Sequence, residues 1–214
     1  ETAKMMRRVD PNIEILVPFT EIVDWTDAYD NINAHQMRLV TQSLEWNLNL
    51  LREAAPYLDW VSIHGYWDAP SYAGDLSGYD SCMVATTLIE KKILKAKHLL
   101  GMMGYLGKLR IAFDEWNLRG WYHPNMPGFT AEEIAARDKN DDNSSYTMAD
   151  AVFSACFLNQ CLKHADTVGM ANFSPTVNTR GLLFTHPEGI VLRSTFFVFE
   201  LYAKYMQDTV VDYW

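Results

Sequence analysis

The alternation of four short apolar segments with helical patterns constrains the fold of this chain most. The apolar segments cover residues 12–19, 60–67, 108–117 and 166–175, and helical spacing of apolar residues follows each of them, at about 35–58, 86–105, 147–165 and 195–206. Strands that helices cover on both faces read as nearly continuous apolar runs. A repeated strand–helix unit gives parallel strands joined by right-handed crossovers. The sequence therefore predicts an α/β fold with a parallel sheet.

Two architectures of this class fit the order of elements: a doubly wound sheet and half of an eight-stranded barrel. No GxGxxG motif follows the first strand, which argues against the dinucleotide-binding version of the doubly wound sheet. Polar and aromatic residues stand at the carboxyl ends of the later strands: His64 and Tyr66, Glu115 and Trp116, Asn172 and Ser174. Barrel enzymes carry their chemistry at that rim. The pattern favours a (β/α)8 TIM barrel, of which this chain holds about four units.

Charge and hydropathy exclude several classes of partner. The net charge is −9 and the chain has no run of Lys or Arg, which argues against nucleic acid and anionic membrane surfaces. No apolar span approaches the roughly 20 residues of a transmembrane helix. Aromatic residues make up 13% of the chain, a share that suits a sugar-binding cleft and a large core equally. Neutral substrates fit this composition better than charged ones.

The cysteines and histidines give no sign of a metal or cofactor. Cys82, Cys156 and Cys161 form no CxxC pair and no zinc-type cluster. Cys156 and Cys161 stand five apart in an apolar helix-like run, which indicates buried free thiols in a reducing compartment and predicts a cytoplasmic protein. The histidines lack the spacing of metal ligands. The chain has no GxSxG motif, so a serine nucleophile is unsupported.

The stretch FDEWN at residues 113–117 ends a strand with two carboxylates. Because side chains alternate along a strand, only one of Asp114 and Glu115 can face the barrel axis. His64 and Tyr66 share a parity, so both can project to one side of the preceding strand, where they would hydrogen-bond an inward carboxylate and hold it ionised. Taken singly, a glutamate at a strand end is more often a cap or an ion-pair partner, and Trp116 is more often packing. Their convergence on one rim favours catalysis.

These motifs resemble glycoside hydrolase family 51. The resemblance is carried by FDEWN, by HGY at residues 64–66 and by DAVFSACFLNQCLKHADTVGMANFSPTVN at residues 150–178, and it extends from the VDP at residues 9–11 to the last helix. The best-known members of the family are α-L-arabinofuranosidases. The resemblance implies a (β/α)8 barrel with an added β-sandwich, hydrolysis with retention of configuration, and an arabinan or arabinoxylan type of substrate, polymeric or oligomeric.

Carried over residue by residue, the resemblance makes Glu115 the catalytic nucleophile. It places His64 and Tyr66 in the sugar subsite, with Tyr66 holding the nucleophile, and leaves Asp114 facing away as structural support. We expect Trp121 and Asn172 to help position the sugar.

Two departures from the family pattern concern the sugar. Leu118-Arg119-Gly120 separates FDEWN from the next aromatic residues, so Trp121 or Tyr122 would have to close over the sugar from a shifted position. Pro175 lies where the family often has a glutamine, whose amide a proline cannot replace. These changes favour one alternative, an endo-acting glucanase or xylanase on the same barrel. A second alternative is a non-catalytic module that binds sugar or serves assembly, because that is what an isolated half barrel would be.

Retaining hydrolysis needs a second carboxylate about 5 Å from the nucleophile to act as acid and base. In family 51 this is the Glu of an Asn-Glu pair after the fourth strand, and these 214 residues contain no such pair. We therefore expect residues 1–207 to be the C-terminal half of the barrel and residues 208–214 to begin the β-sandwich. The N-terminal half of the barrel would then supply the acid/base. The resemblance also implies a possible homo-oligomer.

Overall fold

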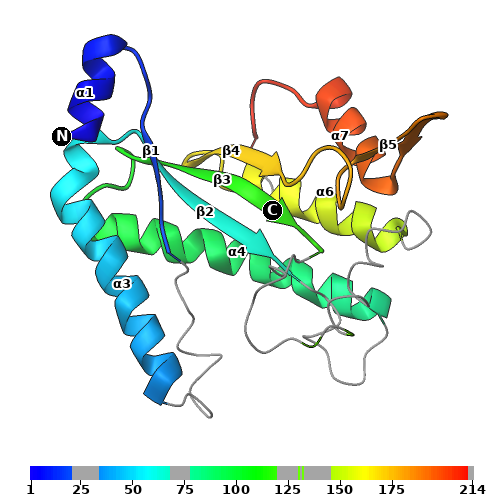
Figure 1. Cartoon of the computed structure of the whole chain (residues 1–214), viewed down its shortest axis with the longest axis horizontal. Coiled ribbons are helices and arrows are strands. Elements are labelled where there is room, and N and C mark those ends of the chain that lie inside the picture. The colour runs from blue at the N-terminus through cyan, green and yellow to red at the C-terminus, as the bar shows by residue number, and fades with distance from the viewer. Residues whose placement is uncertain (21–33, 68–77, 120–129, 131, 133–145, 212–214) are drawn as a thin grey trace. The chain divides into compact units, whose positions relative to one another are not determined.

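A computed structural model describes residues 1–20, 34–67, 78–119, 130, 132 and 146–211. The fold is α/β, with a parallel sheet in the strand order β1-β2-β3-β4 and a separate antiparallel hairpin of β5 and β6 (Figure 1). The helices are α1 (Thr2–Val9), α3 (Ala34–Ala54), α4 (Gly78–Met102), α6 (Met148–Lys163) and α7 (Ser194–Tyr205), with a 3-10 turn η1 (Ala55–Tyr57). The strands are β1 (Leu16–Pro18), β2 (Trp60–Tyr66), β3 (Arg110–Asn117), β4 (Val168–Phe173), β5 (Leu183–His186) and β6 (Gly189–Leu192).

The four strands that the sequence predicts are present, with one of them much shorter than expected. β1 keeps three residues of the predicted 12–19 and pairs in parallel with β2, Val17 lying opposite Val61. Pro18 has no N–H to donate to a ladder, so proline is tolerated only at strand ends and edges. β1 is an edge strand of this sheet and ends at Pro18, in accord with that rule.

The chain divides into two compact units. The first comprises residues 1–64, 91–114 and 164–170, and the second comprises residues 65–90, 115–163 and 171–214. Strands β2, β3 and β4 each begin in the first unit and end in the second. Their carboxyl ends, where the sequence places the candidate site, therefore belong to the second unit, except for His64 and Asp114.

The first unit is held by a buried apolar core and by Asp59. Val61 of β2, Ile93 of α4 and Ile111 of β3 are fully buried. The Asp59 carboxylate accepts hydrogen bonds from the backbone N–H of Ile15 over 2.7 Å and from the Arg7 guanidinium over 2.6 Å. One carboxylate therefore links α1 and the start of β1 to the loop that enters β2.

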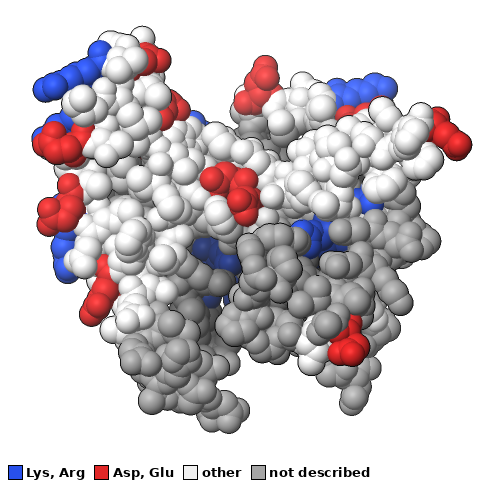
Figure 2. Space-filling model, in the orientation of Figure 1, with Lys and Arg blue, Asp and Glu red and all other residues white. Residues whose placement is uncertain are grey.

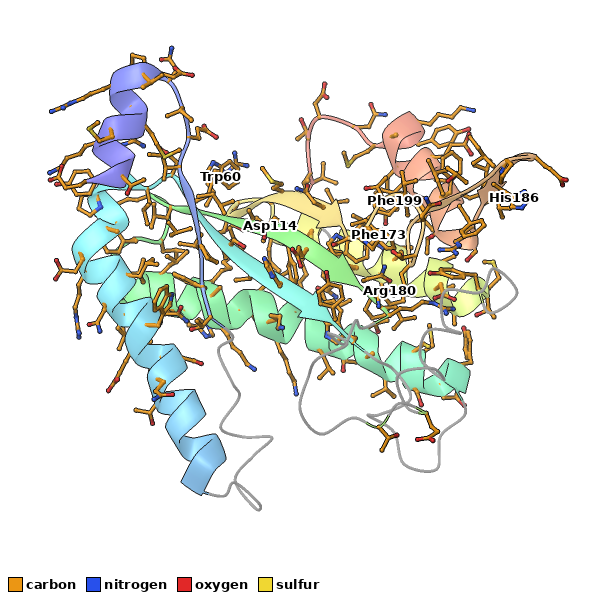
Figure 3. The ribbon with its side chains drawn as sticks, in the orientation of Figure 1. Trp60, Asp114, Phe173, Arg180, His186 and Phe199 are labelled. Carbon is orange, nitrogen blue, oxygen red and sulfur yellow. The ribbon has the colours of Figure 1, made fainter. Side chains whose placement is uncertain are left out.

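The second unit has an aromatic core built by α6, α7 and the ends of β3 and β4. Trp67 packs against Phe153 and Phe157 of α6, with ring centroids 5.4 and 5.8 Å apart. Phe173 of β4 and Phe199 of α7 meet edge to face over 5.5 Å (Figure 3). The N-terminus of α6 is capped by Thr147 and Asp150.

The β5–β6 hairpin was not predicted from the sequence. His186 stands at its tip beside the turn (Figure 3), and Gly189 there has a φ of +154°, a conformation that glycine adopts at little cost. Arg193 fixes the base of the hairpin by donating hydrogen bonds to the carbonyl oxygens of Thr179 and Gly181. The hairpin occupies the connection between β4 and α7, where a β/α unit has its loop.

Residues 208–211 have no regular secondary structure, and residues 212–214 lie outside the described part of the chain. The start of a β-sandwich at 208–214 therefore stays a prediction. Within the described ranges no helix is long and apolar enough to cross a membrane. On the face drawn in Figure 2, the Lys and Arg side chains are scattered over the described residues and form no stripe.

Candidate active site

Tyr66 and Glu115 form the centre of the candidate site. Both lie in the second unit, at the carboxyl ends of β2 and β3. The Tyr66 hydroxyl donates a hydrogen bond to Oε2 of Glu115 over 3.0 Å, and both residues are partly buried. The contact on which the sequence hypothesis depends is present. It fixes one oxygen of the carboxylate and with it the orientation of the other.

The surroundings of Tyr66 keep its phenol protonated. Burial raises the pKa of Tyr66 above its ordinary value of 10.0, and the negative charge of Glu115 raises it further, while the Ser174 side chain and the positive charge of Arg180 act in the opposite direction. The net effect on the pKa is upward. Only the neutral phenol can donate to a carboxylate. A phenol of ordinary pKa is already neutral at neutral pH, so the upward shift of the pKa extends the hydrogen bond to Glu115 to more alkaline pH.

Asn117 connects the end of β3 to the loop that follows β4. Its amide nitrogen donates to the carbonyl oxygens of Ser174 and Arg180, each over 3.1 Å, and its Oδ1 accepts from the backbone N–H of Arg119 over 3.1 Å. The backbone N–H of Ser174 also donates to the Trp116 carbonyl over 3.0 Å. Ser174 and Arg180 are thereby held to the same strand that carries Glu115.

His64 and Asp114 lie in the first unit, where they form a cluster with Ser62. Oδ1 of Asp114 accepts a hydrogen bond from the Ser62 hydroxyl over 2.5 Å and lies 3.3 Å from Nε2 of His64. His64 and Tyr66 share a parity on β2, yet their partners Asp114 and Glu115 are neighbours of opposite parity on β3. Strict alternation on both strands does not produce this pairing, so the sequence argument that grouped His64 with Tyr66 around one carboxylate was incomplete.

Trp116 belongs to the core. Its side chain is fully buried and packs against rings of α6, β4 and α7. A ring in that position has no face to offer a sugar. Trp116 therefore contributes to a large core and not to a sugar-binding cleft.

Comparison with known proteins gives consistent matches. The family model described as "Alpha-L-arabinofuranosidase C-terminal domain" matches residues 114–213. A Streptomyces lividans protein named intracellular exo-α-(1→5)-L-arabinofuranosidase is 28% identical over 218 residues, covering 99% of this chain and 30% of that protein. A probable α-L-arabinofuranosidase C of Aspergillus niger is 28% identical over 210 residues, covering 98% of this chain and 38% of its own length.

Solved structures agree on the fold. The family 51 α-L-arabinofuranosidase of Thermotoga petrophila superimposes with a TM-score of 0.65 at 24% identity, covering 93% of this chain and 33% of that one. These matches make the chain similar to α-L-arabinofuranosidases, and over residues 114–213 to their C-terminal domain. The chain spans about a third of the length of the relatives and of the solved structure that it matches.

Two further residues of the family 51 hypothesis can be placed, and one cannot. Asn172 lies on β4 and is exposed, as a side chain that reaches a sugar has to be. Pro175 follows Ser174 through a cis peptide bond at the point where the family often has a glutamine. Trp121, with Tyr122, lies outside the described residues, and its expected place over the sugar stays a prediction.

Arg119, which stands where the family 51 pattern leads toward an aromatic residue, has a structural partner that sequence reasoning missed. Its guanidinium meets the Asp150 carboxylate through two contacts, Nε to Oδ1 over 2.7 Å and Nη2 to Oδ2 over 3.0 Å. It also lies over the Tyr146 ring, 3.9 Å from the centroid, and the Arg193 guanidinium lies 4.1 Å from the same centroid. The sequence signal was an arginine two positions after the motif. This network fixes the end of β3 to α6.

Proposed function

We propose that this chain carries the nucleophile of a retaining glycoside hydrolase that removes terminal α-L-arabinofuranosyl residues from arabinan- or arabinoxylan-type glycans. The hydrogen bond from Tyr66 to Glu115 at the end of β3 carries the proposal. The match of residues 114–213 to the α-L-arabinofuranosidase C-terminal domain supports it, as does the similarity to a protein named exo-α-(1→5)-L-arabinofuranosidase. The activity, the substrate and the role of each residue are parts of this proposal.

In the proposed first step, the Glu115 carboxylate attacks the anomeric carbon of the arabinofuranosyl unit. The bond from that carbon to the leaving oxygen breaks through an oxocarbenium-like transition state, and an acid/base carboxyl group gives its proton to the departing oxygen. In the second step, the same acid/base group takes a proton from water, the water oxygen attacks the anomeric carbon, and the ester to Glu115 breaks. Two inversions at one carbon give net retention.

Tyr66 acts as a fixed hydrogen-bond donor during these two steps. Its neutral phenol holds one oxygen of Glu115 in place, so that the carboxylate does not have to be oriented during the attack. Asn172, which is exposed on β4, and His64 and Trp121 are proposed to contact the sugar. The exact linkage would depend on the segment around Leu118–Gly120 and Pro175, where the sequence departs from the family pattern.

The architecture that suits this reaction is the C-terminal half of a (β/α)8 barrel over residues 1–207, followed by the start of a β-sandwich at 208–214. Retaining enzymes hold their two carboxyl groups about 5 Å apart. Because these 214 residues contain no Asn-Glu pair, the acid/base carboxylate would come from the N-terminal half of the same barrel. We further propose a cytoplasmic location, which fits the three free cysteines and two relatives that are named intracellular. A homo-oligomer is proposed on the resemblance alone.

Replacement of Glu115 tests the function. In the intact protein, Glu115→Ala should abolish hydrolysis of an aryl α-L-arabinofuranoside, and added azide should restore release of the aryl group by attacking the open anomeric face. The sugar product should then be the β-configured glycosyl azide, because one inversion replaces two. Faster turnover of a β-glucan or xylan than of the arabinofuranoside would indicate an endo-acting enzyme. Unchanged turnover in Glu115→Ala would show that Glu115 is not the nucleophile.

A further inference from the structure

Asn117 is a buried amide whose hydrogen-bonding groups all contact backbone atoms close to Glu115. It lies two residues beyond Glu115 on β3 and is 2% exposed. Its two N–H groups reach the carbonyl oxygens of Ser174 and Arg180, and its carbonyl oxygen accepts from the N–H of Arg119. An asparagine side chain offers two donors and one carbonyl acceptor, and each of them has a partner here.

The two residues that Asn117 holds both act on Tyr66. The Ser174 side chain hydrogen-bonds the Tyr66 phenol, and the positive charge of Arg180 affects the same group. Arg180 is itself buried, so its guanidinium cannot turn into solvent without rearrangement of the loop. One amide on β3 thus fixes two neighbours of the phenol that holds Glu115.

We propose that Asn117 is a positioning residue for the nucleophile: it sets the loop from Ser174 to Arg180, and through this loop the orientation of the Tyr66 hydroxyl on Glu115. Asn117 does not touch the sugar. This inference rests on the proposed function of Glu115 and adds to it a residue that acts through two others.

A purely structural role has to be separated from a positioning role, and the chain offers a matched control. Asn47 of α3 is a second fully buried asparagine whose amide bridges backbone atoms. Its Oδ1 accepts from the Thr20 N–H over 2.9 Å and its nitrogen donates to the Thr20 carbonyl over 3.0 Å. Asn47 belongs to the first unit, whereas Tyr66 and Glu115 belong to the second. Loss of either amide should lower the melting temperature, but only loss of Asn117 should act through Tyr66.

A double-mutant cycle in the intact protein tests the proposal. Asn117→Ala and Asn47→Ala are each made with and without Tyr66→Phe. Together with the unchanged protein and Tyr66→Phe alone this gives six proteins, and kcat for an aryl α-L-arabinofuranoside is measured well below all six melting temperatures. We expect Asn117→Ala to lower kcat about 10- to 100-fold in the otherwise unchanged protein, because a nucleophile displaced by about 1 Å costs that much. In the Tyr66→Phe background the same change should cost about threefold or less, since the contact that it disturbs is already gone.

An equal fall in kcat from Asn117→Ala in both backgrounds would overturn the proposal, and so would an unchanged kcat. The proposal would also fail if the effects of Asn47→Ala and Tyr66→Phe on kcat were non-additive to the same extent. Asn117→Asp provides a second variant if Asn117→Ala does not fold, because it keeps the shape and the acceptor but loses both donors. It should lower kcat with KM changed by about twofold or less. The turnover of Glu115→Ala is measured alongside. If this variant keeps full turnover, the proposed function is wrong. If it is inactive but the double-mutant cycle is additive, only the role of Asn117 is wrong.

Discussion

The indole ring of Trp116 stacks on the phenyl ring of Phe157, with centroids 3.7 Å apart and planes inclined by 12°. Phe173 meets the same indole edge to face over 4.9 Å, and Phe199 lies nearly parallel to it at 5.9 Å. Trp116 is the residue that follows Glu115 in the chain. The strand end that carries the candidate nucleophile is therefore anchored in the aromatic core of the second unit, which limits how far Glu115 can move.

Removal of this anchor should destabilise the protein strongly. Trp116→Ala is expected to cost about 3–5 kcal/mol of the free energy of unfolding, because it leaves a large cavity among rings that cannot collapse onto one another. Urea denaturation measures the difference. Phe197→Ala is the control, since Phe197 of α7 is 48% exposed. A cost for Trp116→Ala no larger than that of the control would show that the aromatic cluster does not hold the strand end.

Removal of the Tyr66 hydroxyl should affect turnover far more than stability. Tyr66→Phe keeps the ring and deletes the donor to Glu115, and we expect kcat/KM to fall about 10- to 100-fold while the melting temperature changes by roughly 2 °C or less. Steady-state kinetics on an aryl α-L-arabinofuranoside and a thermal melt are the two measurements. If kcat/KM changes less than about twofold, the hydrogen bond has no part in holding the carboxylate.

The pair of Arg119 and Asp150 should be costly to break. Their side chains are only 12% and 5% exposed, so Asp150→Ala leaves a buried guanidinium without its carboxylate partner. We expect a loss of about 3–5 kcal/mol in unfolding free energy. Glu1→Gln removes the exposed ion pair with Lys4 and serves as a control that should have no measurable effect. Equal, small effects of both variants would contradict the assignment of Arg119 and Asp150 as an anchor of β3.

The raised pKa of Tyr66 predicts a loss of stability at alkaline pH. Burial is the largest cause of the shift and the charge of Glu115 adds to it, so the folded protein keeps the phenolic proton more tightly than the unfolded chain. The stability contributed by Tyr66 should be fully present below the unfolded pKa of about 10 and should disappear as the pH rises through the higher folded pKa. Above about pH 10 the unfolding free energy of the unchanged protein should therefore fall relative to that of Tyr66→Phe, which has no phenolic proton to lose. Parallel curves would contradict the shift.

The sequence predicted the four strands of the parallel sheet, because they depend on local patterns. The pairing of Tyr66 with Glu115 was predicted from the resemblance to family 51, since the alternation of side chains left open which of Asp114 and Glu115 faces inward. An apolar run with an abrupt polar end locates a strand and its rim, and two such ends on neighbouring parallel strands come together. Trp116 was counted among the residues that converge on the rim, and this was wrong because its side chain is fully buried in the core, the more common role of such a tryptophan taken alone. The family resemblance was stated correctly from FDEWN, HGY and the segment 150–178.

The partners of Asp114, Asn117 and Arg119 could not be predicted, for a physical reason. Each depends on residues about 31 to 63 positions away in the chain, and no periodicity says which of several polar side chains a buried group will meet. The hairpin of β5 and β6 was missed for a different reason. Its strands are four residues each, and they lie between a stronger strand pattern and a stronger helix pattern.

Covalent trapping identifies the residue that attacks the sugar. In a 2-deoxy-2-fluoro arabinofuranosyl glycoside the fluorine slows both steps, because it destabilises the oxocarbenium-like transition states. A good leaving group speeds up only the first step, so the covalent intermediate accumulates. The intact protein should gain the mass of one fluorosugar, and fragmentation of the peptide spanning residues 111–119 should place it on Glu115. A fluorosugar attached to any other carboxylate, or none while the arabinofuranoside is still turned over, would contradict the assignment of Glu115.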